Sequence, residues 1–155
     1  MHKKSTFHFE FPASPPWFRT IRQVIITATQ QCGFDDRTAS QVAMATDEAL
    51  CNIHKHGYGG DQRGLIELDV RTTKLPHPTI CIELGDEGKQ VELNSIRSRN
   101  LEDVRPGGLG VHLIQTIMDE AEWSHNDKGG MKLTMKKMFE LETKTHALES
   151  KESNV

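Results

Sequence analysis

The chain has 155 residues and a formal net charge of −3 at pH 7, which predicts one domain with no strong demand for a nucleic acid or an anionic membrane as partner. No apolar run approaches the roughly 20 residues of a membrane span, and no apolar stretch of the secretory type follows Met1 to Ser5. The three cysteines, Cys32, Cys51 and Cys81, form no CxxC pair, so we expect a reducing cytoplasm.

The first half of the chain predicts one strand followed by two helices. Residues 6–11 alternate apolar and polar side chains, which is typical of a strand. A proline-rich turn then leads into a helix over residues 16–32, because proline is tolerated in a first helical turn and a glycine ends the pattern. A second helix can be capped by Asp35 or Asp36 and continues to about His56.

The second half predicts four strands and one helix. The strands are predicted at 65–70 and 79–84, which are rich in apolar and β-branched residues, and at 122–125 and 131–136, which form a hairpin through residues 126–130. The helix has its apolar positions between residues 111 and 118. Residues 87–106 are mostly polar, and a stretch of that length in a compact domain is typically a functional lid or disordered.

This order of elements predicts an α+β fold, a two-layer sandwich with three helices on one face of a mixed, mostly antiparallel sheet. We expect one domain over residues 1–139. Residues 140–155 are rich in Glu, Lys, Thr and Ser, and we expect them to form a disordered tail.

The first candidate motif lies in the second predicted helix. Glu48, Asn52 and either Lys55 or His56 recur at spacings of three or four, so one helix face carries a carboxylate, a carboxamide and a cation. A carboxylate can take a proton from a hydroxyl group, and the amide oxygen suits Mg²⁺, which prefers oxygen ligands. We expect His56 and Tyr58 to shape the helix end and the wall of a pocket.

Two further motifs follow downstream. Asp86-Glu87-Gly88 ends a predicted strand, and Gly107-Gly108-Leu109-Gly110 opens the last predicted helix. Glycines at a loop-to-helix junction can offer bare backbone N–H groups to phosphates. With the first motif, they predict a site for a nucleotide and Mg²⁺.

Over roughly Phe7 to Met138, these three motifs resemble the ATP-binding domain shared by histidine kinases, gyrase-type ATPases, the ninety-kilodalton heat-shock chaperones and mismatch-repair ATPases. Within that superfamily they look most like the bacterial anti-sigma regulatory factors, which are small serine/threonine protein kinases. The resemblance implies the histidine kinase-like ATPase fold. The middle motif departs from the usual pattern, because Lys89-Gln90 stands where a second glycine is common.

The resemblance also implies roles for individual residues. Asn52 would ligate Mg²⁺, Glu48 would be the catalytic base, and Asp86 would accept a hydrogen bond from the adenine amino group. The remaining candidate nucleotide-binding residues are Lys55, His56, Gly88, Gly107, Gly108, Leu109 and Gly110, with the backbone of the last three contacting the phosphates.

Other interpretations of these residues stay open. Lys55 can bind a phosphate or be an ordinary surface lysine. Cys51 and His54 have the helical spacing of a zinc pair, although no second pair of ligands follows. In the predicted lid, the arginines can reach the phosphates or only add solubility; they are Arg97, Arg99 and Arg105.

The function implied by the resemblance is that of an anti-sigma factor kinase. Such a protein would transfer the γ-phosphate of ATP to a small antagonist protein and separately hold a sigma factor, and relatives of this type are commonly homodimers. The alternative is a binding module that controls a partner in response to ATP or ADP without transferring phosphate. A phosphoryl-transfer domain of a two-component system is a weaker third interpretation, since the chain has no histidine-bearing dimerisation helix.

Overall fold

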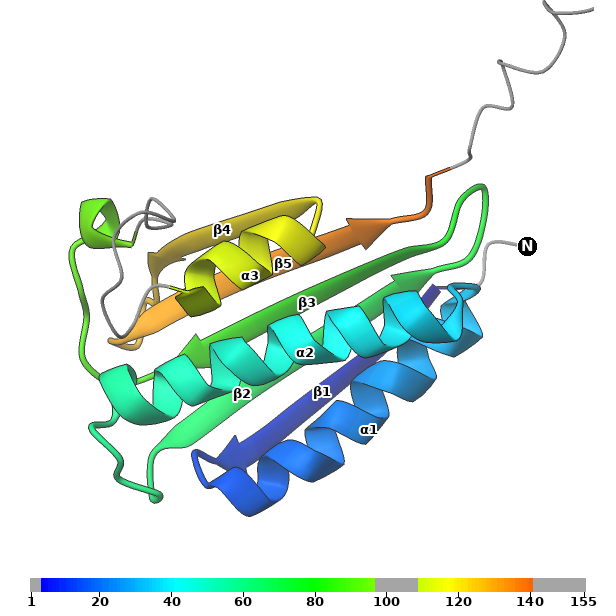
Figure 1. Cartoon of the computed structure of the whole chain (residues 1–155). Coiled ribbons are helices and arrows are strands. Elements are labelled where there is room, and N and C mark those ends of the chain that lie inside the picture. Colours follow the sequence, from blue (N-terminus) through cyan, green and yellow to red (C-terminus); the bar gives the residue numbers. More distant parts are fainter. Residues whose placement is uncertain (1–3, 97–108, 141–155) are drawn as a thin grey trace, which may run out of the picture.

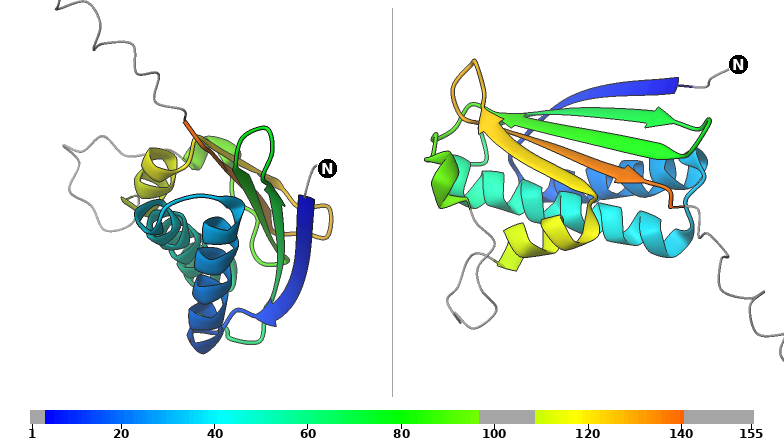
Figure 2. Two further views of the ribbon diagram at one scale, coloured as in Figure 1. Left: turned by 90° about the vertical axis from the view of Figure 1, so that its right-hand side faces the viewer. Right: turned by 90° about the horizontal axis from the view of Figure 1, so that it is seen from above.

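The computed structural model describes residues 4–96 and 109–140 of the chain. The described residues form two layers, a sheet and a layer of helices on one of its faces (Figures 1 and 2). The strands are β1 (Lys4–Pro12), β2 (Leu65–Thr73), β3 (Thr79–Asp86), β4 (Glu120–His125) and β5 (Met131–Met138). The helices are α1 (Pro15–Cys32), α2 (Asp36–Asn52) and α3 (Leu109–Ile117), with a π-helical turn η1 (Ile53–Gly57) and a 3₁₀ turn η2 (Leu93–Ser95). The predicted α+β sandwich is confirmed.

The strand order in the sheet is β1-β2-β3-β5-β4, and all four neighbouring pairs are antiparallel. We expected a mixed, mostly antiparallel sheet, and the strands of the described residues pair only in the antiparallel sense. The reason lies in the last hairpin. A single helix, α3, returns the chain so that β4 points the same way as β3, but β5 folds back and lies between them (Figure 1).

The hydrophobic core lies between the helices and the inner face of the sheet. In β2 and β3 the inward positions alternate strictly, and their side chains are fully or almost fully buried: Ile66, Leu68, Val70, Ile80, Ile82 and Leu84. Helices α1 and α2 cover them with Ile25 and Leu50, which are also fully buried. Burial of each such side chain stabilises the fold by about 1.5–3 kcal/mol. The helices therefore cover the face of the sheet on which these alternating apolar side chains lie.

The outer face of the sheet is polar. Glu83 lies 3.1 Å from the Lys132 ammonium and 3.4 Å from the Arg71 guanidinium, and His8 lies 2.9 Å from Asp69. Such partly exposed pairs typically contribute about 0–1 kcal/mol each. This face therefore needs no covering layer.

The helix boundaries agree with the capping signals. Gly33 ends α1 in the left-handed conformation, with φ of 119°, and the Asp35 carboxylate accepts a 2.8 Å hydrogen bond from the Thr38 N–H at the start of α2. No helix within the described ranges is long and apolar enough to cross a bilayer.

Two of the expected segments are only partly covered by the structure. Of the predicted lid, residues 87–96 are described and contain η2. Residues 97–106, and the predicted tail beyond residue 140, lie outside the described residues.

Candidate functional site

The candidate residues meet at one end of the sheet, where β3 ends, α2 ends and α3 begins (Figure 1). Helix α3 comes so close to α2 that a Cβ atom at Gly110 would lie 2.8 Å from Glu48 Oε2 and 3.5 Å from Asn52 Nδ2. The structure thus brings together a carboxylate and a carboxamide of the first motif with a glycine of the third. Gly107 and Gly108 lie outside the described residues.

The neighbour of Glu48 points elsewhere. Asp47 forms an ion pair with the Arg22 guanidinium of α1, whereas Glu48 faces α3. Two adjacent carboxylates therefore have different surroundings. One ties α2 to α1, and the other is half-buried beside Gly110.

Asp86 ends β3 as a buried side chain, with 3% of its surface exposed. Its Oδ1 accepts hydrogen bonds from the N–H groups of Gly88, at 2.9 Å, and Met131, at 3.3 Å. Burial raises the pKa of this carboxyl group, and the two N–H groups lower it in part. Because both donors bind Oδ1, Oδ2 has no hydrogen-bond partner among residues 4–96 and 109–140 and is available to a ligand.

Two glycines, Gly88 and Gly130, let the backbone pack closely around Asp86. A Cβ atom at Gly88 would collide with the backbone of Gly57, and one at Gly130 would collide with Asp86 itself. The Lys89 N–H donates to the Gly57 carbonyl at 2.8 Å, so the loop after β3 lies directly on η1. Gly88 is thus required where two chain segments touch.

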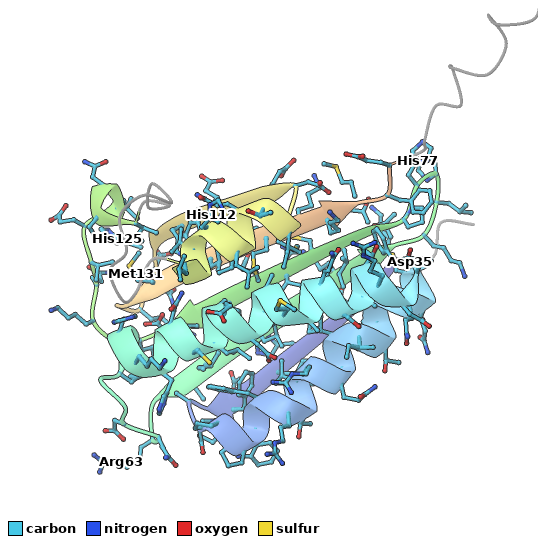
Figure 3. The ribbon with its side chains drawn as sticks, in the orientation of Figure 1. Asp35, Arg63, His77, His112, His125 and Met131 are labelled. Atoms are coloured by element: carbon cyan, nitrogen blue, oxygen red, sulfur yellow. The ribbon has the colours of Figure 1, made fainter. Side chains whose placement is uncertain are left out.

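Figure 3 shows Met131 at this end of the sheet and His77 at the opposite end.

The π-helical turn η1 was not predicted. It follows Asn52 directly, and the Tyr58 N–H donates to the Ile53 carbonyl at 3.0 Å across the wider turn. Turns of this type occur frequently at functional sites. Lys55 and His56 lie on η1 as exposed side chains, so their predicted contacts with a nucleotide stay predictions.

Tyr58 connects three segments of the site. Its hydroxyl accepts a 2.8 Å hydrogen bond from the Glu87 N–H and donates to the Leu65 carbonyl, and its ring fills the space that a side chain at Gly64 would take. It therefore holds the loop after β3 against the start of β2.

His54 lies on the other side of η1. Its Nδ1 is 2.8 Å from the Ala13 carbonyl oxygen, and its ring meets Phe18 edge-on with centroids 6.4 Å apart. These contacts join the end of α2 to the β1–α1 turn. Within the described ranges, no three His, Cys, Asp or Glu side chains are placed to share a metal ion.

An open hollow of about 400 Å³ lies beside Glu48. The residues within the described ranges that line it are Glu48 and, on α3, Leu109, Gly110, His112, Leu113 and Thr116. The Glu48 side chain therefore borders the hollow and also lies close to Gly110, as Asn52 does. Leu109 is 67% exposed, which is high for a leucine.

The site fits a nucleotide with Mg²⁺ on three observations. Oδ2 of Asp86, at the end of β3, accepts no hydrogen bond from residues 4–96 and 109–140. Asn52 and Glu48 supply oxygen donors of the kind that Mg²⁺ prefers. Gly110 leaves open the space beside these two side chains at the first turn of α3, where backbone N–H groups favour anions.

Comparison with known proteins identifies the family to which this fold belongs. Residues 11–137 match the family described as the histidine kinase-like ATPase domain. The chain is 24% identical to a serine-protein kinase RsbW of Halalkalibacterium halodurans, over 90% of this chain and 87% of that protein. It is 26% identical to a serine-protein kinase RsbW of Listeria innocua, over 88% of each.

Two solved structures share the fold. The SiaB–SiaC complex from Pseudomonas aeruginosa contains a chain with a TM-score of 0.59 and 13% identity, covering 86% of this chain and 88% of that one. The RsbU and RsbW domains of a Mycobacterium tuberculosis protein give a TM-score of 0.58 and 19% identity, over 86% of this chain and 32% of that one. The predicted ATPase fold is confirmed.

Proposed function

Because this chain belongs to the histidine kinase-like ATPase domain family, we propose that it is a serine/threonine protein kinase of the anti-sigma factor type. It uses ATP with Mg²⁺ to phosphorylate a small antagonist protein, and it sequesters a sigma factor through a separate surface. The observation that carries this proposal is the close approach of Glu48 and Asn52 to Gly110. Relatives named as serine-protein kinases support it over most of the chain. The cytoplasm is the compartment that we propose.

Each residue has a distinct part in the proposed reaction. Asp86 Oδ2 accepts a hydrogen bond from the adenine amino group. Asn52 contributes an oxygen ligand to Mg²⁺, which when bound offsets charge on the phosphates. The backbone N–H groups at the start of α3 hold phosphate oxygens, and Gly110 admits them because it lacks a side chain.

Glu48 is the proposed catalytic base. Its carboxylate lies beside both Asn52 and the open hollow, so a hydroxyl group entering the hollow can hydrogen-bond to it. Glu48 orients the serine or threonine hydroxyl and takes its proton as the γ-phosphoryl group is transferred. Positioning and electrostatics carry most of such a reaction, so few reactive side chains suffice.

The second candidate is a binding module that responds to ATP or ADP without transferring phosphate. It is favoured by Lys89-Gln90, which replaces the second glycine that is common in this motif. Asp86, Asn52 and Gly110 would serve nucleotide binding in both cases. Glu48 is needed only for transfer.

Incubation of the protein with Mg²⁺, γ-labelled ATP and the antagonist protein from the same genome separates the two candidates. We expect label on a serine or threonine of the antagonist with the wild-type protein and not with Glu48→Gln. Glu122→Gln, an exposed residue on β4, is the matched control and should transfer normally. If the wild-type protein binds ATP and captures the sigma factor but moves no label, the binding module is the correct function.

A further inference from the structure

The turn between β4 and β5 contacts the end of β3. It covers residues 126–130 and is closed by its own backbone, since the Asn126 N–H donates to the Gly130 carbonyl and the Gly129 N–H donates to the Asn126 carbonyl, each at 3.1 Å. These bonds do not involve the Asn126 side chain. Its Nδ2 instead donates a 3.0 Å hydrogen bond to the Asp86 carbonyl oxygen. Figure 3 labels the two residues that flank the turn, His125 and Met131, at this end of the sheet.

Asn126 reaches Asp86 across Gly85. Gly85 occupies an outward position of β3, directly before the buried Asp86. A Cβ atom there would lie 3.2 Å from Asn126 Nδ2, which is closer than an ordinary contact. The Lys128 ammonium, 2.9 Å from Glu67 Oε1 on β2, also ties the turn to the sheet. The turn therefore lies over the outer face of the sheet, and the glycine leaves room for the asparagine amide.

The peptide group between Asp86 and Glu87 is held at both of its ends. Asn126 Nδ2 donates to its carbonyl oxygen, and the Tyr58 hydroxyl accepts a 2.8 Å hydrogen bond from its N–H. The two partners come from different segments, the β4–β5 turn and the end of η1. Because a peptide group is planar, hydrogen bonds at its opposite ends fix the orientation of the whole plane.

The orientation of this plane bears on the Asp86 carboxylate. The Gly88 N–H, which donates to Oδ1 at 2.9 Å, belongs to the next peptide group along the chain. Rotation of the held plane would move that N–H, and Oδ1 would lose a donor that sets its direction. The proposed adenine contact uses Oδ2, and its position follows from that of Oδ1 because both oxygens belong to one rigid carboxylate. A hydrogen bond weakens steeply when its angle is poor.

We propose that Asn126 is a positioning residue for base recognition, which holds the Asp86–Glu87 peptide group so that Asp86 Oδ2 meets the amino group of adenine. The inference rests on the proposed function, in which Asp86 binds the adenine of ATP. Asn126 acts through Asp86 and not on the nucleotide itself. The β4–β5 turn thereby contributes to the preference for ATP over GTP.

Two neighbouring residues of the turn provide a matched test. Asn126→Ala removes the amide and keeps the backbone bonds of the turn, and Asp127→Ala changes an exposed residue of the same turn. Titration calorimetry with Mg²⁺ measures the affinities of the whole chain for ATP and for GTP. We expect ATP to bind about fivefold more weakly to Asn126→Ala, as for the loss of one hydrogen bond, while GTP binds as before. Asp127→Ala should match the wild type with both nucleotides.

A second pair of variants tests the held peptide group itself. Asn126→Asp keeps the shape of the side chain but has no donor, so its ratio of ATP to GTP affinity should fall as in Asn126→Ala, even where the alanine variant folds poorly. Tyr58→Phe releases the other end of the same peptide group. Since either release frees the plane, the double variant Asn126→Ala with Tyr58→Phe should have the affinity ratio of the more affected single variant.

Three results would overturn the positioning role. An unchanged ratio of ATP to GTP affinity in both Asn126 variants means that Asn126 does not position Asp86. Equal losses of ATP and GTP affinity mean that its role is only structural. Losses that multiply in the double variant mean that Asn126 and Tyr58 do not act through one plane. If the wild-type protein prefers ATP but transfers no phosphate, the kinase function fails and the positioning role stands; if it binds no ATP, both fail.

Discussion

Gly110 at the start of α3 faces Glu48 on α2 at a distance that leaves no room for a side chain. A Cβ atom at Gly110 would lie 2.8 Å from Glu48 Oε2. The atom in the way is the far end of a flexible side chain, so an added methyl group would displace the carboxylate and not the backbone. A substitution at Gly110 can therefore move the Glu48 carboxylate without changing the stability of the fold.

Gly110→Ala should reduce phosphate transfer without loosening the fold. Misplacement of a catalytic group by about 1 Å can cost up to about 10²-fold in rate. Alanine is the better helix former by about 1 kcal/mol, so the melting temperature should stay the same or rise. Transfer kinetics and thermal unfolding of the same preparation test this. A wild-type rate in Gly110→Ala would mean that the position of Glu48 is not critical.

Gly88→Ala should have the opposite outcome. Its Cβ would collide with the Gly57 backbone, which cannot rotate away as a side chain can. We expect a lower melting temperature and weaker ATP binding together, because Asp86 is held by the same loop through the Gly88 N–H. A variant as stable as the wild type would show that the loop moves freely.

Glu48→Gln and Asn52→Ala should separate catalysis from metal-dependent binding. Glutamine keeps the size of Glu48 but cannot take a proton, so ATP should still bind while transfer falls by roughly 10²–10⁴-fold. Asn52→Ala removes the proposed Mg²⁺ ligand and should weaken ATP binding in Mg²⁺ more than in its absence. Equal ATP affinity in Asn52→Ala and wild type, with Mg²⁺ present, would exclude Asn52 as a ligand.

Asp86→Asn should favour stability while weakening nucleotide binding. Burial raises the pKa of Asp86 in the folded protein above its usual value of 3.8. Its ionisation therefore opposes folding as pH rises through the raised pKa, whereas below the usual value both states are protonated and the effect is absent. Asparagine removes this cost and still accepts from the Gly88 and Met131 N–H groups. At neutral pH the variant without nucleotide should melt at the same temperature as the wild type or higher.

The same variant tests the adenine contact. In Asp86→Asn, the amide Nδ2 stands where Oδ2 was, and it is a donor that cannot accept a hydrogen bond from the adenine amino group. ATP should therefore no longer raise the melting temperature as a ligand of the native state does. In the wild type, ATP should stabilise more than GTP. The affinity of the wild-type protein for ATP should decline as pH falls through the raised pKa of Asp86. Equal stabilisation by ATP and GTP would remove Asp86 from the adenine site.

Tyr58→Phe should destabilise the site end of the sheet. It deletes a hydroxyl that bonds to both the Glu87 N–H and the Leu65 carbonyl, at a cost of about 1–3 kcal/mol in the free energy of unfolding. The ring remains against Gly64, so packing is preserved. Ser95→Ala, which removes an exposed hydroxyl bonded to the Glu92 carbonyl, is the control and should cost less. Urea denaturation of the three proteins measures the difference.

The elements of this fold could be predicted because local patterns specify them. The alternation in β2 and β3, Gly33 at the end of α1 and the Asp35 cap of α2 are each readable from a few neighbouring residues. The first motif was readable for the same reason. Glu48 and Asn52 are one helical turn apart, so helix geometry alone puts them on one face.

The strand order, the π-helical turn and the burial of Asp86 depend on tertiary contacts, so local sequence patterns could not predict them. Insertion of β5 between β3 and β4 makes the sheet antiparallel, and that depends on which edge of β3 the last hairpin pairs with. The π-helical turn accepts backbone hydrogen bonds from the N–H groups of Tyr58 and Lys89, which lie far apart in the sequence. Asp86 acquires its raised pKa only when the fold buries it at the end of β3, beside Gly57 of η1 and the start of β5. The sequence by itself determined which residues are available for chemistry. Their distances, burial and open sides were set by packing between segments far apart in the chain, since those energies depend on the whole fold.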